Sequence, residues 1–428
     1  MDRFSKFLLL FYVFTLMTFG FWVNYTSFTL IIDVAGLLLF VYYTFKRKGK
    51  ISIPPDLKGI YQEFALFLAG IIIVTIISLL RGIPLTMCIL GSRDYFEFML
   101  VGFIIRSLIS DEEHHDMFMA YITVFAVVMC GFGLVQFFFH DHLPDKLLHV
   151  RSGRLDYVYG LGALIFRINA LFENSIVFDG IIIIASALVF GSLLIKGKSI
   201  VRLIGFGITI AANILTFSRA SIIGSIFVYA VEYLILGKKG KFEKYIRVIA
   251  IGTLVVFLFV TFGRDTAVYQ RLFNTSLTST SDIVHSTTIR AARKAVGEHP
   301  ILGLGMGTQG YDNAGSTVSV IRDGCWLQFA LECGMPLTIL YGIILLSLIV
   351  TALRKMNFID RGSQVIACGS YVAIMLYFIV ASFINSAYNA KEVFGLCWVI
   401  TGMMLWNSPQ EDLEDLEDQE DLEPTTRS

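Results

Sequence analysis

The chain has 428 residues, of which 56% are hydrophobic and only 16% are charged, and its mean hydropathy is +0.71. This composition excludes an ordinary soluble globular protein and predicts an integral membrane protein. The formal net charge is zero, but residues 411–423 supply nine of the 34 acids. Residues 1–410 alone carry 33 basic and 25 acidic side chains, a net charge of +8.

Apolar runs long enough to cross a bilayer recur along the chain. We expect an all-α polytopic membrane helix bundle of about twelve transmembrane helices in residues 1–407, followed by an acidic, disordered cytoplasmic tail at 408–428. Two of the runs are irregular, because 95–110 contains Glu97 and one long stretch must turn back at Arg219. The runs are 7–22, 25–45, 60–80, 95–110, 117–139, 176–195, 201–217, 219–236, 246–263, 325–353, 364–385 and 392–407.

Basic loops predict the orientation of these spans. Residues 46–50, 196–202, 238–247 and 354–361 are rich in Lys and Arg, and all four segments face the cytoplasm if both termini are cytoplasmic. The basic and then apolar start resembles a signal peptide, but no cleavage site follows, so we interpret it as an uncleaved first helix. Two long loops then face out, at about 140–175 and 264–324, the second between spans nine and ten, and loops of such length are usually functional.

Arginine predominates in the outward segments and lysine in the inward ones. The outward segments hold eleven Arg and three Lys, whereas the inward ones hold eight Arg and twelve Lys. Outward cations oppose the positive-inside rule, and a guanidinium matches phosphate oxygens with two donors, so the pattern predicts a phosphate-handling site facing out. The alternative is that individual Arg side chains snorkel to the interface. The outward cations are Arg81, Arg93, Arg151, Arg154, Arg167, Arg219, Arg264, Arg271, Arg290, Arg293, Arg322, Lys146, Lys294 and Lys391.

Two regions of the chain hold the strongest candidates for phosphate binding, the turn at Arg219 and the segment 286–298. Arg219 lies at the outer hinge between two apolar runs, where an Arg is costly unless it faces a cavity or a partner. Residues 286–298 contain few helix breakers, and a helix there would place Arg290, Arg293 and Lys294 on one side.

The segment from residue 300 to 336 combines glycines with charged residues. Gly305 to Gly310 matches GxGxxG, but no βαβ unit surrounds it, so we expect these glycines to allow a close backbone approach to a ligand or a helix. Arg322 and Asp323 precede the tenth span, and Asp323 is either a site residue or a helix N-cap. Glu332 follows in apolar surroundings, either in a site or in a buried ion pair with an outward Arg.

At these residues the chain resembles the O-antigen polymerase and ligase superfamily of bacterial membrane glycosyltransferases. The resemblance covers roughly residues 160–340. It rests on four elements in the family's order: Arg167 in 166–174, Ser218-Arg219, Arg290 about ten residues before His299-Pro300-Ile301-Leu302-Gly303-Leu304-Gly305, and Trp326-Leu327 to Glu332-Cys333-Gly334. The ligases usually begin the last element with a His, whereas this chain has Asp323, which favours the polymerase branch.

The resemblance implies a GT-C-like, metal-independent glycosyltransferase without a cofactor. Such an enzyme would polymerise polyprenyl-diphosphate-linked repeat units into O-antigen, capsule or exopolysaccharide, outside the bacterial cytoplasmic (inner) membrane. Arg219 and Arg290 would clamp the diphosphate, supported by Arg167, Arg293 and Arg322, because its developing charge needs cations. Asp323 would accept or orient the proton of the attacking hydroxyl, with Glu173 and His299 as the other candidate bases.

Other readings of the chain stay open. An O-antigen ligase acting on lipid A–core, a flippase or transporter of lipid-linked sugars, and a non-catalytic scaffold are the alternatives. Expected partners are the lipid-linked glycans, membrane lipid, and flippase and chain-length regulator proteins, without nucleic acid. The six cysteines lack metal or disulfide spacing. His140, Asp141, His142 and His149 are weak evidence for a metal site, and an interfacial loop is the alternative.

Overall fold

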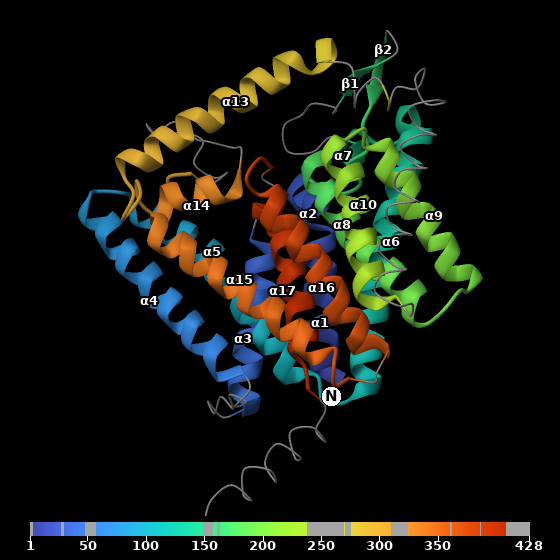
Figure 1. Ribbon diagram of the computed structural model, residues 1–428, viewed down its shortest axis with the longest axis horizontal. Coiled ribbons are helices and arrows are strands. Elements are labelled where there is room, and N and C mark those ends of the chain that lie inside the picture. The colour runs from blue at the N-terminus through green and yellow to red at the C-terminus, as the bar shows by residue number, and fades with distance from the viewer. Residues whose placement is uncertain are drawn as a thin grey trace, which may run out of the picture.

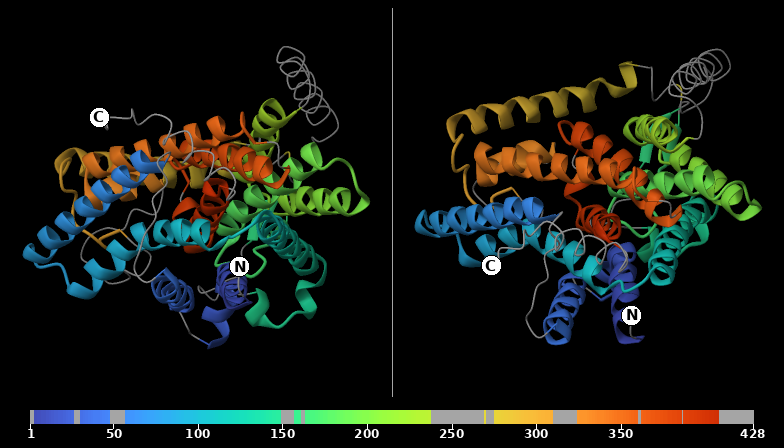
Figure 2. Two further views of the ribbon diagram at one scale, coloured as in Figure 1. Left: turned by 90° about the horizontal axis from the view of Figure 1, so that it is seen from below. Right: turned by 60° about the horizontal axis from the view of Figure 1, so that its bottom comes forward.

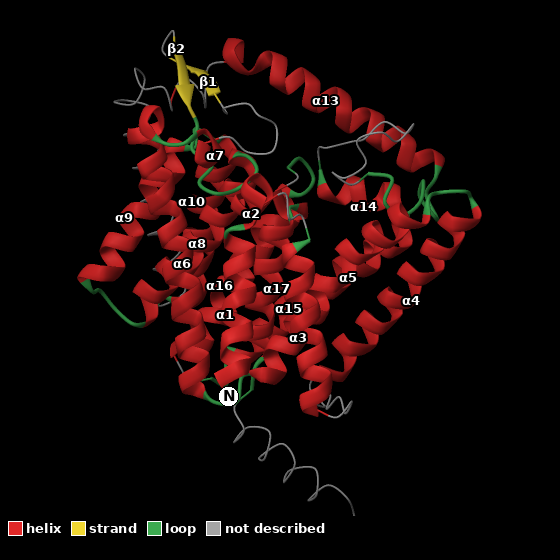
Figure 3. Cartoon of the chain, turned by 180° about the vertical axis from the view of Figure 1, so that it is seen from behind, coloured by secondary structure: helices red, strands yellow, loops and turns green. Residues whose placement is uncertain are grey.

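The computed structural model describes residues 3–26, 30–47, 57–148, 157–160, 163–237, 269, 275–309, 324–359, 362–385 and 387–407. Within these ranges the chain is almost entirely helical, with one short β-hairpin (Figures 1 and 3). The prediction of an all-α protein is confirmed for this part of the chain.

Six of the described helices are long and apolar enough to cross a membrane, which indicates a membrane protein. They are α4 (Lys58–Leu80), α6 (Glu112–Phe139), α8 (Ser175–Ile195), α10 (Arg219–Leu236), α15 (Met335–Lys355) and α16 (Gly362–Ala381). Shorter or more polar helices occupy further predicted spans: α1 (Arg3–Met17), α2 (Phe19–Thr26), α3 (Ile31–Arg47), α5 (Leu85–Leu108), α9 (Ile200–Leu215) and α17 (Lys391–Leu405). The predicted span 246–263 and the tail 408–428 lie outside the described residues.

Two of the predicted spans are in fact broken. The run 7–22 divides into α1 and α2 at Thr18, and the run 325–353 divides at Gly334 into α14 (Cys325–Cys333) and α15. Gly334 has φ +81° and ψ 166°, a backbone conformation essentially restricted to glycine, and Pro336 follows in the first turn of α15. A helix cannot continue through this geometry, which the apolar composition of the run does not reveal.

The predicted turn at Arg219 is confirmed. Helix α9 ends at Leu215 and α10 begins at Arg219. Phe217 between them has φ +50°, which is uncommon for a bulky residue, and the Ser218 hydroxyl caps α10 by accepting from the backbone N–H of Ser221.

The core is formed by helices packed closely around α8, most of whose residues are buried. Helix α8 packs against α9, α10 and α16, and α5 packs against α17. Gly102 and Gly402 bring α5 and α17 together, because a Cβ on Gly402 would overlap the carbonyl of Gly102. Small residues at a helix crossing allow this close approach, as they do in membrane proteins generally.

One end of the bundle carries most of the structure outside the spans. Helix α13 (Thr275–Glu298) crosses this end beside α14, and the hairpin of β1 (Tyr157–Gly160) and β2 (Ala163–Phe166) lies near its other extremity (Figures 1 and 2). The strands pair antiparallel, with Tyr157 opposite Phe166. We call this the α13 end; the N-terminus lies at the opposite one (Figure 1). Both predicted long loops therefore contribute to the same end, which also includes η2 (His140–His142), α7 (Asp145–Leu148) and η3 (Ala387–Asn389).

Candidate functional site

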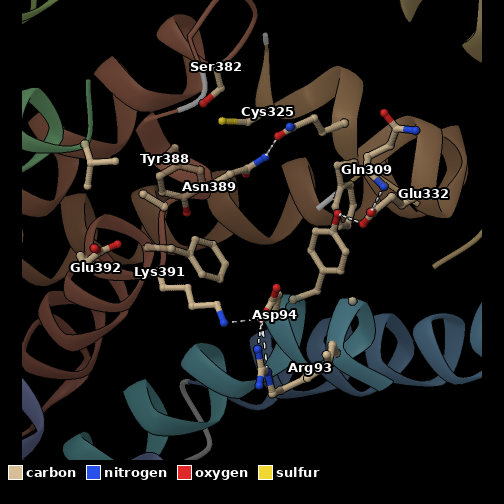
Figure 4. A pocket seen from close by; sticks show the side chains of 18 of the residues that line it. Arg93, Asp94, Gln309, Cys325, Glu332, Ser382, Tyr388, Asn389, Lys391 and Glu392 are labelled. Atoms are coloured by element: carbon tan, nitrogen blue, oxygen red, sulfur yellow. Dashed lines mark hydrogen bonds and ion pairs between the residues drawn. The ribbon is translucent and has the colours of Figure 1, made fainter. Parts of the chain in front are cut away.

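A cavity of about 270 Å³ lies among α5, α8, α14 and α17, and we call it the central cavity. Its wall combines aromatic, amide and charged side chains inside an otherwise apolar helical protein (Figure 4). Small-molecule pockets start at roughly 300 Å³, so the central cavity has room for one compact group such as a single sugar ring. Ionisable groups are costly at such depth and are a functional-site hypothesis by default.

A network of charges around Arg93 forms one side of this cavity. The Arg93 guanidinium lies 2.8 Å from Asp33 on α3, 2.8 Å from Asp94 and 3.6 Å from Glu97. Lys391, at the start of α17, is 3.6 Å from the same Asp94 carboxylate. Three carboxylates thus surround Arg93, so its charge is already compensated and it is poorly suited to bind a further anion.

The opposite side is ordered by the carboxylate of Glu332. It accepts hydrogen bonds from the Tyr95 hydroxyl and, at 2.6 Å, from the backbone N–H of Gln309 (Figure 4). Both of these partners are neutral groups, and the ion pair with an outward Arg that the sequence suggests stays a prediction. Hydrogen bonds to an ionised carboxylate are the stronger kind, so Glu332 fixes α5, α14 and the 301–309 segment around the cavity.

Between these sides lie aromatic rings and a pair of amides. Asn389 Nδ2 donates to Gln328 Oε1, and the Tyr341 and Tyr388 hydroxyls are 2.8 Å apart. The rings of Tyr95 and Phe329 meet edge to face, with centroids 4.5 Å apart. Apolar ring faces beside amide and carboxyl groups suit a ligand that has both C–H faces and hydroxyls.

The glycine-rich segment positions Gln309 by close packing. Gly303 and Gly307 have φ +62° and +77°, and a Cβ on either residue would overlap a backbone carbonyl, of Leu331 in α14 and of Met87 in α5 respectively. The expectation that these glycines let the backbone approach a neighbouring helix is therefore confirmed. Arg81 holds the same segment by donating to the Gly303 carbonyl at 3.0 Å.

Arg167 and Arg219 belong to a second polar group at the α13 end. Arg167 Nε donates to the Thr216 carbonyl at 2.7 Å, immediately before the turn that presents Arg219, which is half-buried. Beneath them Asp179 is 2% exposed, and its carboxylate interacts electrostatically with Arg167 and faces the hydroxyls of Thr216, Ser218 and Ser221. Neither Asp179 oxygen makes a direct hydrogen bond within the described residues.

The basic face of α13 is exposed. The predicted helix at 286–298 is confirmed within α13, and Arg290, Arg293 and Lys294 are all solvent-accessible. Helix α13 packs on α14 through Ala292, which contacts Leu331. Arg290 precedes Ala292 by about half a helical turn and so points away from α14. His299, at the end of α13, is exposed as well.

The predicted site residues therefore fall into separate groups. Glu173 lines the central cavity, whereas Arg167, Arg219 and Arg290 do not. Arg322 and Asp323 lie outside the described residues, although the cavity-lining Cys325 follows them closely. Gly324 lies at the N-cap position of α14, and the two roles suggested for Asp323, as a site residue or as a helix N-cap, stay predictions.

Sequence reasoning missed the charged network and the amide pair of the central cavity. Arg93 and Lys391 were noted only as outward cations and Glu97 only as an irregularity of its span. The sequence feature that could have revealed this network is the close spacing of Arg93, Asp94 and Glu97 within one helix. Charged side chains inside an apolar segment need partners. The part of the chain that the structure describes holds no cluster of three His, Cys, Asp or Glu suited to a metal, and His140 stacks on Phe166.

No protein-family model matches this chain, and no curated protein sequence matches it either.

Proposed function

We propose that this protein is a membrane glycosyltransferase that polymerises polyprenyl-diphosphate-linked repeat units into a surface polysaccharide on the outer side of the bacterial cytoplasmic membrane. The observation that carries the proposal is the central cavity, where aromatic rings, amides and carboxylates are buried together at the α13 end of an apolar bundle. The order of Arg167, Ser218-Arg219, Arg290 and Glu332, which resembles the O-antigen polymerases and ligases, supports it.

In this proposal the central cavity receives a sugar of the acceptor. Sugar hydroxyls donate to carboxylates such as Glu173, while the aromatic rings cover the apolar face of the sugar. The acceptor hydroxyl attacks the anomeric carbon of the donor, and the bond from that carbon to the diphosphate oxygen breaks. The hydroxyl proton passes to a carboxylate, for which Asp323 and Glu173 are the candidates, with His299 as a further base.

The leaving diphosphate needs cations from elsewhere, because Arg93 is already compensated by three carboxylates. Arg219 at the start of α10 is the first candidate, since a helix N-terminus adds favourable backbone N–H groups. Arg167 supports the turn before it, and Arg290 and Arg293 are exposed on α13. Arg322 is a further candidate from the sequence. No resident metal or cofactor enters this scheme.

The test is polymer formation by the purified full-length protein in lipid nanodiscs supplied with lipid-diphosphate-linked repeat units. A ladder of glycan lengths is expected, and Arg219→Ala should lower its rate about a hundred- to a thousandfold, the typical loss for one charge-stabilising donor. Arg354→Ala, in the last turn of α15, is the matched control and should leave the rate unchanged.

Other outcomes identify the alternatives. Transfer of glycan to lipid A–core would indicate a ligase, and movement of intact lipid-linked sugar across the bilayer without a new glycosidic bond would indicate a flippase or other transporter. Either result would overturn the polymerase proposal.

A further inference from the structure

A second cavity, of about 380 Å³, opens on the bundle between α6 and α9, and we call it the α6–α9 groove. It is independent of the central cavity and shares no lining residue with it. Its walls are aliphatic and include Val124 and Val128 from α6 and Val201 and Ile204 from α9. These four side chains are 50–73% exposed, so this wall faces the surroundings of the bundle instead of its core.

The inside of the groove is apolar even where its side chains carry hydroxyls. Thr123 donates to the Met119 carbonyl at 2.8 Å, and Ser192 donates to the Leu188 carbonyl at 2.7 Å. Both hydroxyls are thus engaged with the backbone of their own helix. The groove therefore suits a hydrocarbon chain.

Two cations close one end of the groove, where α8 passes into α9. Lys196 caps the C-terminus of α8, and Arg202 lies in the first turn of α9. Arg202 Nη1 donates to the carbonyls of Lys196 at 2.9 Å and Gly197 at 2.5 Å, which fixes the guanidinium at the mouth. The one described acid paired with either cation is Asp116, 3.5 Å from Lys196, and both members of that pair are well exposed. Positive charge therefore predominates at this end.

An apolar groove that ends in fixed cations matches the two parts of an anionic phospholipid. We propose that the α6–α9 groove binds an anionic phospholipid, with an acyl chain along α6 and α9 and its phosphate at Lys196 and Arg202. Basic pockets between membrane helices are established sites for such headgroups. A zwitterionic lipid has a compensating cation of its own and gains less from the same pair of side chains.

The lipid site lies at the opposite end of α8 from the central cavity, because α8 begins beside Glu173 and ends at Ile195. Helix α8 is the most buried of the six long apolar helices and packs against α9, α10 and α16 (Figure 1). A bound lipid would therefore stabilise the contact of α6 with α9 without entering the cavity.

The test is native mass spectrometry of the delipidated full-length protein, titrated with palmitoyl-oleoyl phosphatidylglycerol and, separately, with the phosphatidylcholine of the same chains. We expect phosphatidylglycerol to bind more tightly, and Lys196→Gln/Arg202→Gln to weaken its binding by roughly thirtyfold, about fivefold for each surface cation. Lys198→Gln is the matched control, because Lys198 lies in the same connection but does not line the groove. It should change the affinity by less than about twofold.

A second pair of variants tests the apolar part. Gly205 lines the groove, and a Cβ there would make only ordinary contact with Val127, so Gly205→Leu fills the groove and should abolish binding of phosphatidylglycerol. Gly207→Leu places the same side chain on the same helix in open space and should leave binding intact. Equal affinity for the two lipids, or equal effects of Gly205→Leu and Gly207→Leu, would overturn the proposal whatever reaction the protein catalyses.

Discussion

Several arginine side chains at the α13 end are bound to groups of the protein itself. Arg81 donates to the Gly303 carbonyl, Arg93 lies among three carboxylates, and Arg167 donates to the Thr216 carbonyl. Planar guanidinium groups bridge carbonyls and carboxylates as readily as phosphates. The abundance of arginine at this end therefore serves in part to fix turns. Arg219 and Arg290 are the candidates for phosphate because of their positions, Arg219 at the N-terminus of α10 and Arg290 on the exposed face of α13.

The electrostatic interaction of Arg167 with the buried Asp179 leads to a prediction about stability. Asp179 is buried in α8, so Arg167→Ala leaves its charge without compensation and should lower the free energy of unfolding by about 3–5 kcal/mol. Adding Asp179→Asn removes that charge and should recover at least about 1 kcal/mol. Unfolding in mixed detergent micelles measures both effects.

The control for this cycle is Arg290→Ala, because Arg290 is exposed on α13. It should change the free energy of unfolding by less than about 0.5 kcal/mol. Strictly additive losses for Arg167→Ala and Asp179→Asn would show that the two side chains are not coupled.

These residues also show how far sequence reasoning reaches at this scale. The sequence suggested Glu173 as a candidate base and placed Arg219 at a turn between two apolar runs. In the structure Glu173 lines the central cavity and Arg219 begins α10 after that turn. The contacts of Glu332 with Tyr95 and of Arg93 with Asp33 join different helices. Apolar periodicity says little about which helix faces which, so a single sequence could not supply those pairs.

At the scale of elements, the break between α14 and α15 requires a glycine at position 334. A Cβ at Gly334 would overlap the Ile301 carbonyl, and φ +81° with ψ 166° is strained for any other residue. Gly334→Ala should therefore lower the free energy of unfolding by at least about 2 kcal/mol and displace α14. Thermal unfolding in detergent and hydrogen exchange over 324–334 measure the two effects.

The same substitution on α15 provides the comparison. Gly342 lies within that helix, and a Cβ there would meet nothing within 4 Å. Gly342→Ala should stabilise the protein by about 0.5–1 kcal/mol, because alanine is the better helix former. Similar changes at both positions would mean that Gly334 is not conformationally required.

The start of α6 shows a pH-dependent contribution to stability. The Asp111 side chain caps α6 by accepting from the His114 backbone N–H at 3.0 Å. Partial burial raises the pKa of Asp111, but hydrogen bonds from the Ser110 hydroxyl, the His114 backbone and the His114 ring outweigh it, and its pKa lies well below the usual value. Since the pKa is lower in the folded state, this contribution is fully present above the unfolded value near pH 4 and is lost as the pH falls toward the folded value.

Asp111→Ala should thus cost about 1 kcal/mol at neutral pH, the usual loss of an N-cap, and less as the pH falls below about 4. Unfolding measured from pH 7 to pH 3 on the wild type and the variant tests this. A difference that stays constant over that range would exclude the charged cap as its cause.

For the whole molecule, composition was sufficient to predict an all-α protein of the membrane class, because long apolar runs can only be buried or face lipid. It could not predict that 7–22 and 325–353 are each broken, since Thr18 and Gly334 interrupt helices without interrupting hydrophobicity. The basic loops did place the segments 140–175 and 264–324 on one side of the membrane, but they could not show that Glu173 and Gln309 from these segments line a common cavity. Such convergence depends on packing between residues far apart in the chain.

The arrangement of the two ends predicts how the protein sits in its membrane. Cysteine labelling can test this orientation, because all six native cysteines are buried and should react little with a maleimide. A membrane-impermeant maleimide added to intact spheroplasts should therefore label Arg290→Cys on α13, which is exposed at the α13 end. Lys198→Cys, in the exposed connection from α8 to α9, should be labelled only after permeabilisation, since basic connections stay in the cytoplasm. Labelling of Lys198→Cys but not of Arg290→Cys in intact spheroplasts would show the opposite orientation. The α13 end and the central cavity would then face the cytoplasm, whereas the proposed polymerisation takes place on the outer side of the membrane.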